Sequence, residues 1–322
     1  MAYVGLHTQQ VRNNFRSVLL LCLFPCLVVA LTLLFSVLIV FFASEKQMNM
    51  DVWEQSLQIF LQLAPVILVG VAIWFFIAYF ANTAIIRSAT GARPLQRKEN
   101  KRVYNLVENL CMTQGMTMPK INLIEDDSLN AFASGINNRT YTVSLSRGII
   151  DKLEDDELEG VIAHELTHIR NRDVRLLIVS IVFVGIFAML TQIAFRALRF
   201  APARNRNNNG KNGTGTIVLI LIALVVAAIG YLFSTLMRFA ISRNREYMAD
   251  AGAAEMTRRP YALANALRKI SRDPDIEAVT RDDVAQLFIE HPRKKEPLFA
   301  GISGLFATHP PIEKRIAVLE QF

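Results

Sequence analysis

The sequence predicts a mainly α-helical membrane protein with four transmembrane helices and a water-exposed α+β part that contains a small β-hairpin. Three observations lead to this fold class: 52% of the 322 residues are hydrophobic, these residues gather in four long runs, and the polar segments between the runs show helical and alternating patterns. The mean hydropathy of +0.30 is high for a water-soluble enzyme and indicates membrane segments beside a globular part.

Four apolar runs are each long enough to cross a bilayer as a helix, which takes about 20 residues. The first run is far longer than the apolar core of a signal peptide and ends without a good cleavage site, so we expect it to remain as an anchor. The runs are Ser17–Ala43, Leu57–Ile86, Leu176–Phe195 and Thr216–Met237.

Basic residues beside these runs predict the orientation, because loops rich in Lys and Arg stay in the cytoplasm. The segment between the first two runs is mainly acidic, whereas six Lys and Arg residues lie between Arg87 and Arg102. The amino terminus and the region from Arg87 onward are therefore expected in the cytoplasm. The linker between the last two runs is also basic, so these runs either span the membrane or form a hairpin that does not cross fully. Arg238, Arg243 and Arg245 follow the fourth run and favour spanning.

The expected organisation interleaves membrane and water-exposed segments. The expected parts are a cytoplasmic tail (1–16), a two-helix anchor (17–86), a first water-exposed piece (87–174), a second membrane pair (175–237) with a basic linker (196–215), and a second water-exposed piece (238–322). The net charge of +7 comes mainly from residues beside the apolar runs, which predicts contact with lipid headgroups and not with nucleic acid. Three cysteines without paired spacing predict neither disulfides nor a cysteine metal site.

Local patterns predict the elements of the first water-exposed piece. Apolar residues recur at helical spacing over Lys101 to Gln114, which predicts an amphipathic helix. A short strand is expected over Ile121 to Ile124. Two further strands, Ala131 to Ile136 and Thr140 to Leu145, flank the turn composition Asn-Asn-Arg and predict a β-hairpin.

The segment His-Glu-Leu-Thr-His lies on a predicted helix that begins at about Asp155. Residues four apart share one face of a helix, so His164 and His168 can direct imidazole nitrogens at one cation. Zinc accepts such nitrogens and keeps a position open for water in catalytic sites. Glu165 then lies beside the metal as the base for that water. The pattern predicts a catalytic metal site, because a purely structural site does not need Glu165.

The third ligand is less clear from the pattern. The extended motif that would supply a third histidine needs Gly and His where this chain has Asn171 and Val174, so that class is excluded. Directly after the fourth run, Glu246 and Asp250 are four residues apart on one helical face. One could bind the metal while the other hydrogen-bonds an imidazole. Taken by itself, Glu246 is read equally well as the ion-pair partner of Arg243.

Four segments together resemble the HtpX membrane metallopeptidases and, more distantly, the CAAX prenyl endopeptidases. The resemblance covers nearly the whole chain, including two apolar runs before the motif helix and two after it. The segments are His164 to Asp173, Ser242 to Asp250, Asn130 to Gly135, and Thr308-His309-Pro310-Pro311.

This resemblance implies a zincin-like metalloprotease domain with one zinc ion per subunit, in which Glu246 is the third ligand and Asp250 supports the ligands. It also implies proteolysis of damaged or misfolded membrane proteins, facing the cytoplasm of the bacterial inner membrane, as part of a stress response. The CAAX enzymes have more membrane segments than the four expected here, which disfavours cleavage of prenylated carboxyl termini.

Two further groups are expected near the reaction. By the same resemblance His309 is a catalytic donor to the oxyanion, and Arg315 orders the site; alternatively, His309 opens a rigid turn into a final helix, Ile312 to Leu319, with Arg315 on its solvated face. Asn130 and Ala131 are expected to bind substrate, since an extended peptide could add to the hairpin edge through backbone hydrogen bonds. An ordinary core hairpin is the alternative.

Two other functions fit the sequence less well. A membrane scaffold that keeps zinc only for structure would not need Glu165. A transporter would need a polar pathway, but the four runs contain almost no ionisable residues.

Overall fold

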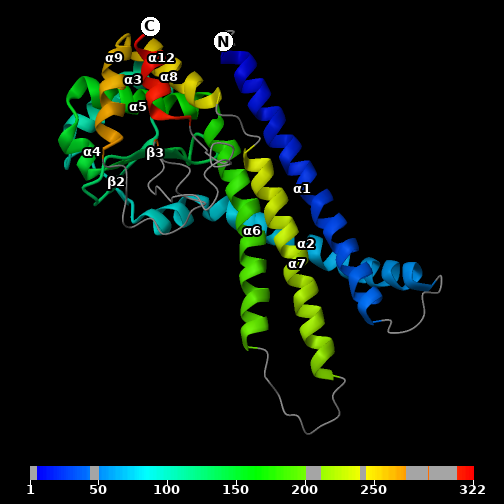
Figure 1. Ribbon diagram of the computed structural model, residues 1–322. Helices are drawn as coiled ribbons and strands as arrows, with labels where there is room; N and C mark the ends of the chain where they lie inside the picture. The colour runs from blue at the N-terminus through cyan, green and yellow to red at the C-terminus, as the bar shows by residue number, and fades with distance from the viewer. Residues whose placement is uncertain (1–5, 44–50, 201–211, 240–243, 273–288, 290–309) are drawn as a thin grey trace. The chain divides into compact units, whose positions relative to one another are not determined.

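The computed structural model describes residues 6–43, 51–200, 212–239, 244–272, 289 and 310–322 (Figure 1). The chain forms two compact units from interleaved segments. One consists of Met1–Ser17, Tyr79–Ile178 and Phe239–Phe322, and the other of Val18–Ala78 and Val179–Arg238. The predicted fold class is confirmed in its coarse form, since the structure is mostly helical with one small mixed sheet.

Long helices cover all four apolar runs. They are α1 (Leu6–Ala43), α2 (Asp51–Thr90), α6 (Asp173–Phe200) and α7 (Asn212–Phe239). Within the described residues two stretches are long and apolar enough to cross a membrane, Cys22–Phe42 and Val52–Ala81, and α7 adds the shorter apolar stretch Ile220–Phe233. The helices are thus confirmed, while four membrane spans stay a prediction.

The unit formed by Val18–Ala78 and Val179–Arg238 is held together by apolar contacts between these helices. Phe24 on α1 packs edge to face against Phe187 on α6, with ring centroids 5.7 Å apart. Gly230 on α7 lies against the same ring, and a Cβ atom there would be 2.3 Å from it. A glycine is therefore needed where α7 passes α6.

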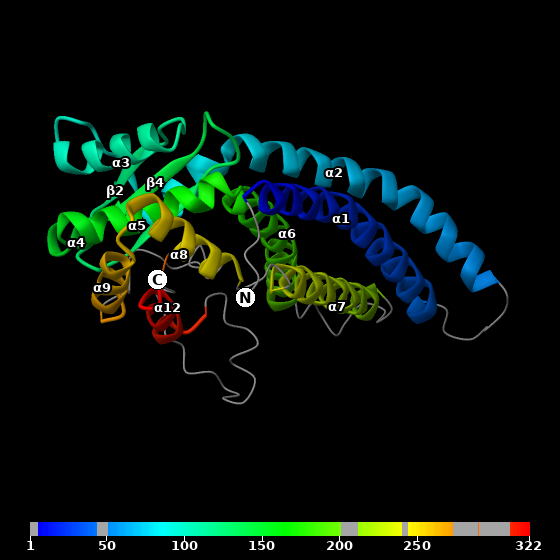
Figure 2. The same ribbon diagram turned by 90° about the horizontal axis from the view of Figure 1, so that it is seen from above.

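The other unit contains a four-stranded sheet in the order β1-β2-β4-β3 (Figure 2). The strands are β1 (Arg93–Pro94), β2 (Lys120–Ile124), β3 (Ala131–Ser134) and β4 (Thr142–Ser146). The predicted hairpin is confirmed, because β3 and β4 pair antiparallel with Ala131 opposite Leu145. Its turn needs Gly135, which has φ +110° and whose Cβ would clash with the carbonyl oxygen of Thr140. The predicted strand at Ile121–Ile124 is also confirmed, and it pairs parallel with β4.

Helix α5 (Asp155–Arg170) is the central element of this unit. It begins where the sequence predicted, at a capping box in which Glu154 and Glu157 bond each other's backbone. It contacts β3 and β4 of the sheet, and also α3, α8 and α9. The helices of this unit besides α5 are α3 (Lys101–Thr113), α4 (Arg147–Lys152), α8 (Asn244–Thr257), α9 (Pro260–Ile270) and the predicted final helix α12 (Ile312–Leu319). Its side chains are buried from Leu158 to Ile169 with one exception, Glu159, so functional groups on it lie inside the protein.

Candidate metal centre

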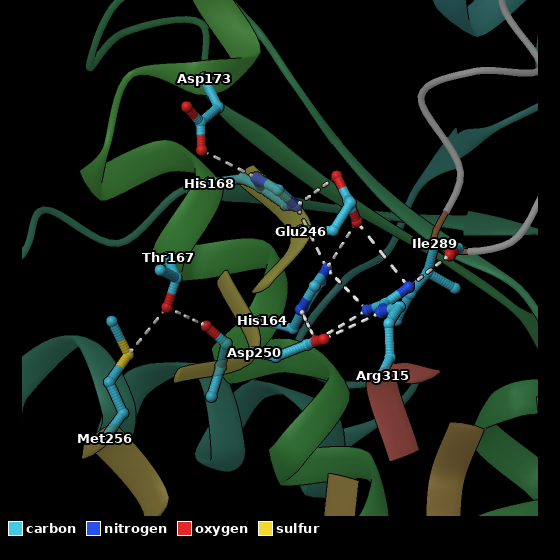
Figure 3. A network of polar contacts seen from close by, with 10 residues as sticks. His164, Thr167, His168, Asp173, Glu246, Asp250, Met256, Ile289 and Arg315 are labelled. Carbon is cyan, nitrogen blue, oxygen red and sulfur yellow. Dashed lines mark hydrogen bonds and ion pairs between the residues drawn. The ribbon is translucent and has the colours of Figure 1, made fainter. Parts of the chain in front are cut away.

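Helix α5 brings both motif histidines and the glutamate into the interior. His164, Glu165 and His168 are exposed by only 0%, 2% and 8%. One turn of helix separates the two imidazoles, and their Nε2 atoms lie 3.1 Å apart (Figure 3). Buried polar groups need partners, so the contacts of these rings decide what the site can do.

Helix α8 supplies a carboxylate to the same point. Glu246, in the first turn of α8, places Oε2 3.6 Å from His164 Nε2 and Oε1 3.6 Å from His168 Nε2. The donor atoms of these three buried residues all lie within 4.8 Å of one another. A tetrahedral zinc ion with bonds of 2.0–2.1 Å separates its ligand atoms by about 3.3 Å, so the arrangement fits such an ion. Arg243, the alternative partner of Glu246, lies outside the described residues.

Each imidazole is held from behind by a second carboxylate. Asp250 Oδ1 lies 3.0 Å from His164 Nδ1, and Asp173 Oδ2 lies 3.0 Å from His168 Nδ1 (Figure 3). A carboxylate oxygen accepts a hydrogen bond from a protonated ring nitrogen, so these positions favour hydrogen on Nδ1 of both rings, and both Nε2 atoms face Glu246. The sequence reasoning singled out Asp250 but missed Asp173. The only signal was its place at the end of the motif segment, five residues after His168.

The guanidinium of Arg315 is fully buried beside this cluster. It binds Asp250 through two hydrogen bonds, Nε to Oδ2 at 2.9 Å and Nη2 to Oδ1 at 2.8 Å. Its Nη2 is also 3.4 Å from His164 Nε2, and its Nη1 is 3.8 Å from Glu246 Oε2. The alternative that Arg315 lies on a solvated face is therefore wrong, because α12 turns this side chain inward onto Asp250.

The electrostatics of the site favour a cation between the imidazoles. Burial raises the pKa of Glu165. Burial alone would lower the pKa of His168, but the charge of Glu246 and the hydrogen bond with Asp173 outweigh it and raise this pKa to about 10. Burial likewise opposes ionisation of Asp250, yet Arg315 holds the pKa of that carboxyl below its usual range. Four buried carboxylates thus surround the two imidazoles, and a divalent cation would balance much of their charge.

The hairpin edge lies next to Glu165. The Glu165 carboxylate has a backbone hydrogen bond from Ala133 on β3, and β3 is the last strand of the sheet. The side chain of Asn130 is buried and accepts a hydrogen bond from the amide of Ala131 at 3.0 Å. The carbonyl of Ala131 accepts one from the amide of Ile289 at 2.9 Å, and the carbonyl of Ile289 accepts one from Arg315. The predicted substrate role of Asn130 and Ala131 stays a prediction.

His309 lies outside the described residues. The remaining candidates, His164, Glu165, His168, Glu246, Asp250 and Arg315, are brought together in one buried cluster.

The chain is similar to known proteins over most of its length. The sequence profile described as "Peptidase family M48" matches residues 97–322. A protein named protease HtpX homolog from Bacteroides fragilis is 67% identical over 325 residues, which cover 100% of both chains. A protein of the same name from Dictyoglomus thermophilum is 40% identical over 253 residues, covering 78% of this chain and 80% of that protein. The crystal structure of Ste24p from S. mikatae aligns with a TM-score of 0.43 and 20% identity, covering 81% of this chain and 58% of that chain.

Proposed function

The chain belongs to peptidase family M48 and is a metallopeptidase, and on this premise we propose that it is a zinc endopeptidase that cleaves misfolded or damaged membrane proteins. The predicted resemblance to HtpX proteases is confirmed by the relatives that carry that name. One observation supports the proposal most directly. Two imidazole nitrogens and a carboxylate from separate helices converge within 4.8 Å, and the buried carboxylate of Glu165, which interacts electrostatically with all three groups, is not one of them.

In the proposed mechanism His164, His168 and Glu246 would hold the metal, and Glu165 would accept a proton from the attacking water. The chemistry that zinc would supply there is Lewis acidity, which makes water easier to deprotonate and polarises a carbonyl group. The raised pKa of Glu165 suits it to take this proton and then to pass it to the leaving amine. Arg315 places positive charge beside the ligands, where negative charge develops on the substrate carbonyl oxygen.

The proposed location is the bacterial inner membrane, with several passes and with the amino terminus and the catalytic unit in the cytoplasm. The two apolar stretches on α1 and α2 support attachment to a membrane. Large apolar side chains such as Val66, Phe76 and Phe80 are more than half exposed on α2, which fits contact with lipid. Basic residues between Arg87 and Arg102 support the cytoplasmic orientation.

The proposed substrates are extended, unfolded segments, because an edge strand binds the backbone of a peptide without regard to most of its side chains. On the edge of β3 that faces away from β4, the carbonyl of Ala131 accepts a hydrogen bond from the amide of Ile289. A substrate strand at this edge would take the place of Ile289 and would meet Glu165 and Arg315 together. Such broad tolerance suits the removal of damaged proteins.

A direct test compares the wild-type protein with Glu165→Ala in detergent, on an unfolded membrane protein as substrate. We expect the variant to lose peptide cleavage while it still binds zinc, because Glu165 is not among the three converging ligands. A chelator should stop the wild-type reaction, and added zinc should restore it. The control is Glu313→Ala, which removes an exposed glutamate on α12. Undiminished cleavage by Glu165→Ala would refute the assignment.

A further inference from the structure

The turn after α5 aims a carboxylate at the second motif histidine. Helix α5 ends at Arg170. Arg172 has φ +62°, a left-handed backbone conformation that residues other than glycine rarely adopt. Asp173 follows as the first residue of α6. In one continuous helix a residue five positions after His168 would point about 140° away from it around the axis. The turn at Arg172 abolishes that offset and lets Asp173 reach the ring.

The contact itself is buried and specific. Asp173 is fully buried, and its Oδ2 lies 3.0 Å from Nδ1 of His168 (Figure 3). The nitrogen on the other side of this ring, Nε2, faces Glu246 at 3.6 Å. A hydrogen bond at Nδ1 therefore fixes both the tautomer and the direction of Nε2.

The two imidazoles are supported in different ways. Asp250, behind His164, itself accepts hydrogen bonds from Nε and Nη2 of Arg315, which comes from α12. Asp173, behind His168, comes from the start of α6 and is delivered by the backbone turn at Arg172. The Arg315–Asp250 pair thus orients His164 only, and His168 needs its own support.

We propose that Asp173 is a positioning residue that holds His168 with Nε2 directed at the metal, so that the turn between α5 and α6 is part of the metal centre. This inference rests on the proposed zinc function. The left-handed Arg172 supports it, because a strained backbone conformation of this kind persists where the surrounding structure requires it and is common beside functional sites.

A simpler role for Asp173 is to stabilise the first turn of α6, where negative charge is favoured by the helix dipole. Serine provides a short oxygen for a helix start but cannot reach the imidazole ring. Asparagine is close to aspartate in shape and keeps an acceptor oxygen within reach, although it lacks the charge. These two substitutions therefore separate the two roles.

The experiment measures zinc affinity, by competition with a chromophoric chelator, for the full-length wild-type protein and for Asp173→Ser and Asp173→Asn. The melting temperature of each zinc-free protein is measured alongside. Loss of a hydrogen-bonded partner behind a ligating histidine lowers metal affinity by about 10- to 100-fold, which we expect for the serine variant. The zinc affinity of the asparagine variant should lie between those of the serine variant and the wild type, and its melting temperature should be unchanged. The control is Asp156→Ser, which removes an exposed acidic residue from the first turn of α5 and should leave zinc affinity unchanged.

The outcomes are distinct. If Asp173→Ser binds zinc as tightly as the wild type, Asp173 is only part of a helix start and the inference is overturned. If the serine variant does not fold, the asparagine variant decides: weaker binding at an unchanged melting temperature supports the inference, and equal binding overturns it. If the wild-type protein itself does not bind zinc, the proposed function falls, and the inference falls with it.

Discussion

Replacing Gly252 with alanine should disturb the metal centre without touching any of its ligands. Gly252 lies on α8, six residues after Glu246, at the point where α8 passes α5. A Cβ atom there would lie 2.4 Å from Cγ2 and 2.9 Å from Oγ1 of Thr167, the residue next to His168. Both helices contribute ligands at this crossing, so their separation sets the ligand distances.

The expected size of the effect follows from these distances. Carbon atoms in good contact are 3.5–4.0 Å apart, so the helices must separate by roughly 1 to 1.5 Å or Thr167 must rotate. Overpacking of this kind destabilises by about 1–3 kcal/mol, and the better helix propensity of alanine offsets about 0.5–1 kcal/mol of that. A zinc site tolerates about 0.2 Å in its ligand distances, so we expect both lower stability and weaker zinc binding.

The assay combines unfolding of the zinc-free protein in detergent with competition for zinc. Gly70→Ala is the control, because a Cβ atom at Gly70 meets nothing within 4 Å. Adding Thr167→Ser to Gly252→Ala removes the clashing methyl group and should recover part of both losses. If Gly252→Ala is as stable as the wild type and binds zinc equally well, the close approach of α5 and α8 does not set the ligand geometry.

Two further predictions concern charge. Arg315→Leu leaves the carboxylate of Asp250 buried without its guanidinium and should destabilise the protein by about 3–5 kcal/mol; thermal unfolding that matches the wild type would contradict this pairing. Zinc affinity should rise with pH up to about 10, because the proton on Nε2 of His168, which the negative charges of Glu246 and Asp173 stabilise, must leave before the metal binds. The zinc-free protein should show the opposite trend: the pKa of His168 is raised from 6.5, so its contribution to stability is complete below that value and is lost as the pH rises toward about 10. Zinc affinity that stays constant between pH 6 and 9 would contradict the first trend, and stability that stays constant would contradict the second.

Local patterns in the sequence predicted the elements that depend on local chemistry. The helices of the four apolar runs, the motif helix and the hairpin follow from hydrophobic periodicity and turn composition within short windows. Strand β1 was missed, because its two residues pair with β2 only through tertiary contact and carry no pattern of their own. Spacing on one helix also indicated that His164 and His168 converge, because it is a local property, whereas Glu246 as the third ligand came from the family resemblance.

The supporting residues could not be predicted in the same way. Asp173 reaches His168 only because Arg172 adopts a left-handed conformation. In a sequence such a conformation is usually marked by glycine, and this position holds arginine. Arg315 looked equally suited to a solvated face, because its partner Asp250 lies 65 positions earlier in the chain. The need for Gly252 depends on how closely two helices cross. The contacts of Arg315 and Gly252 thus depend on the packing of segments that are distant in the sequence, and that of Asp173 depends on a backbone conformation that the sequence does not indicate.

This packing gives the metal a part in folding as well as in catalysis. Helices α5 and α8 bring Glu165, Glu246 and Asp250 together in the interior, where like charges repel and burial penalises ionisation. Arg315 balances one of these charges, and a proton shared with the histidines balances another in the zinc-free protein. A divalent cation binds the folded arrangement and has no comparable site in the unfolded chain, so its binding free energy adds to the stability of the α5–α8 pair. The same surplus of negative charge would favour a doubly charged cation over a singly charged one at this centre.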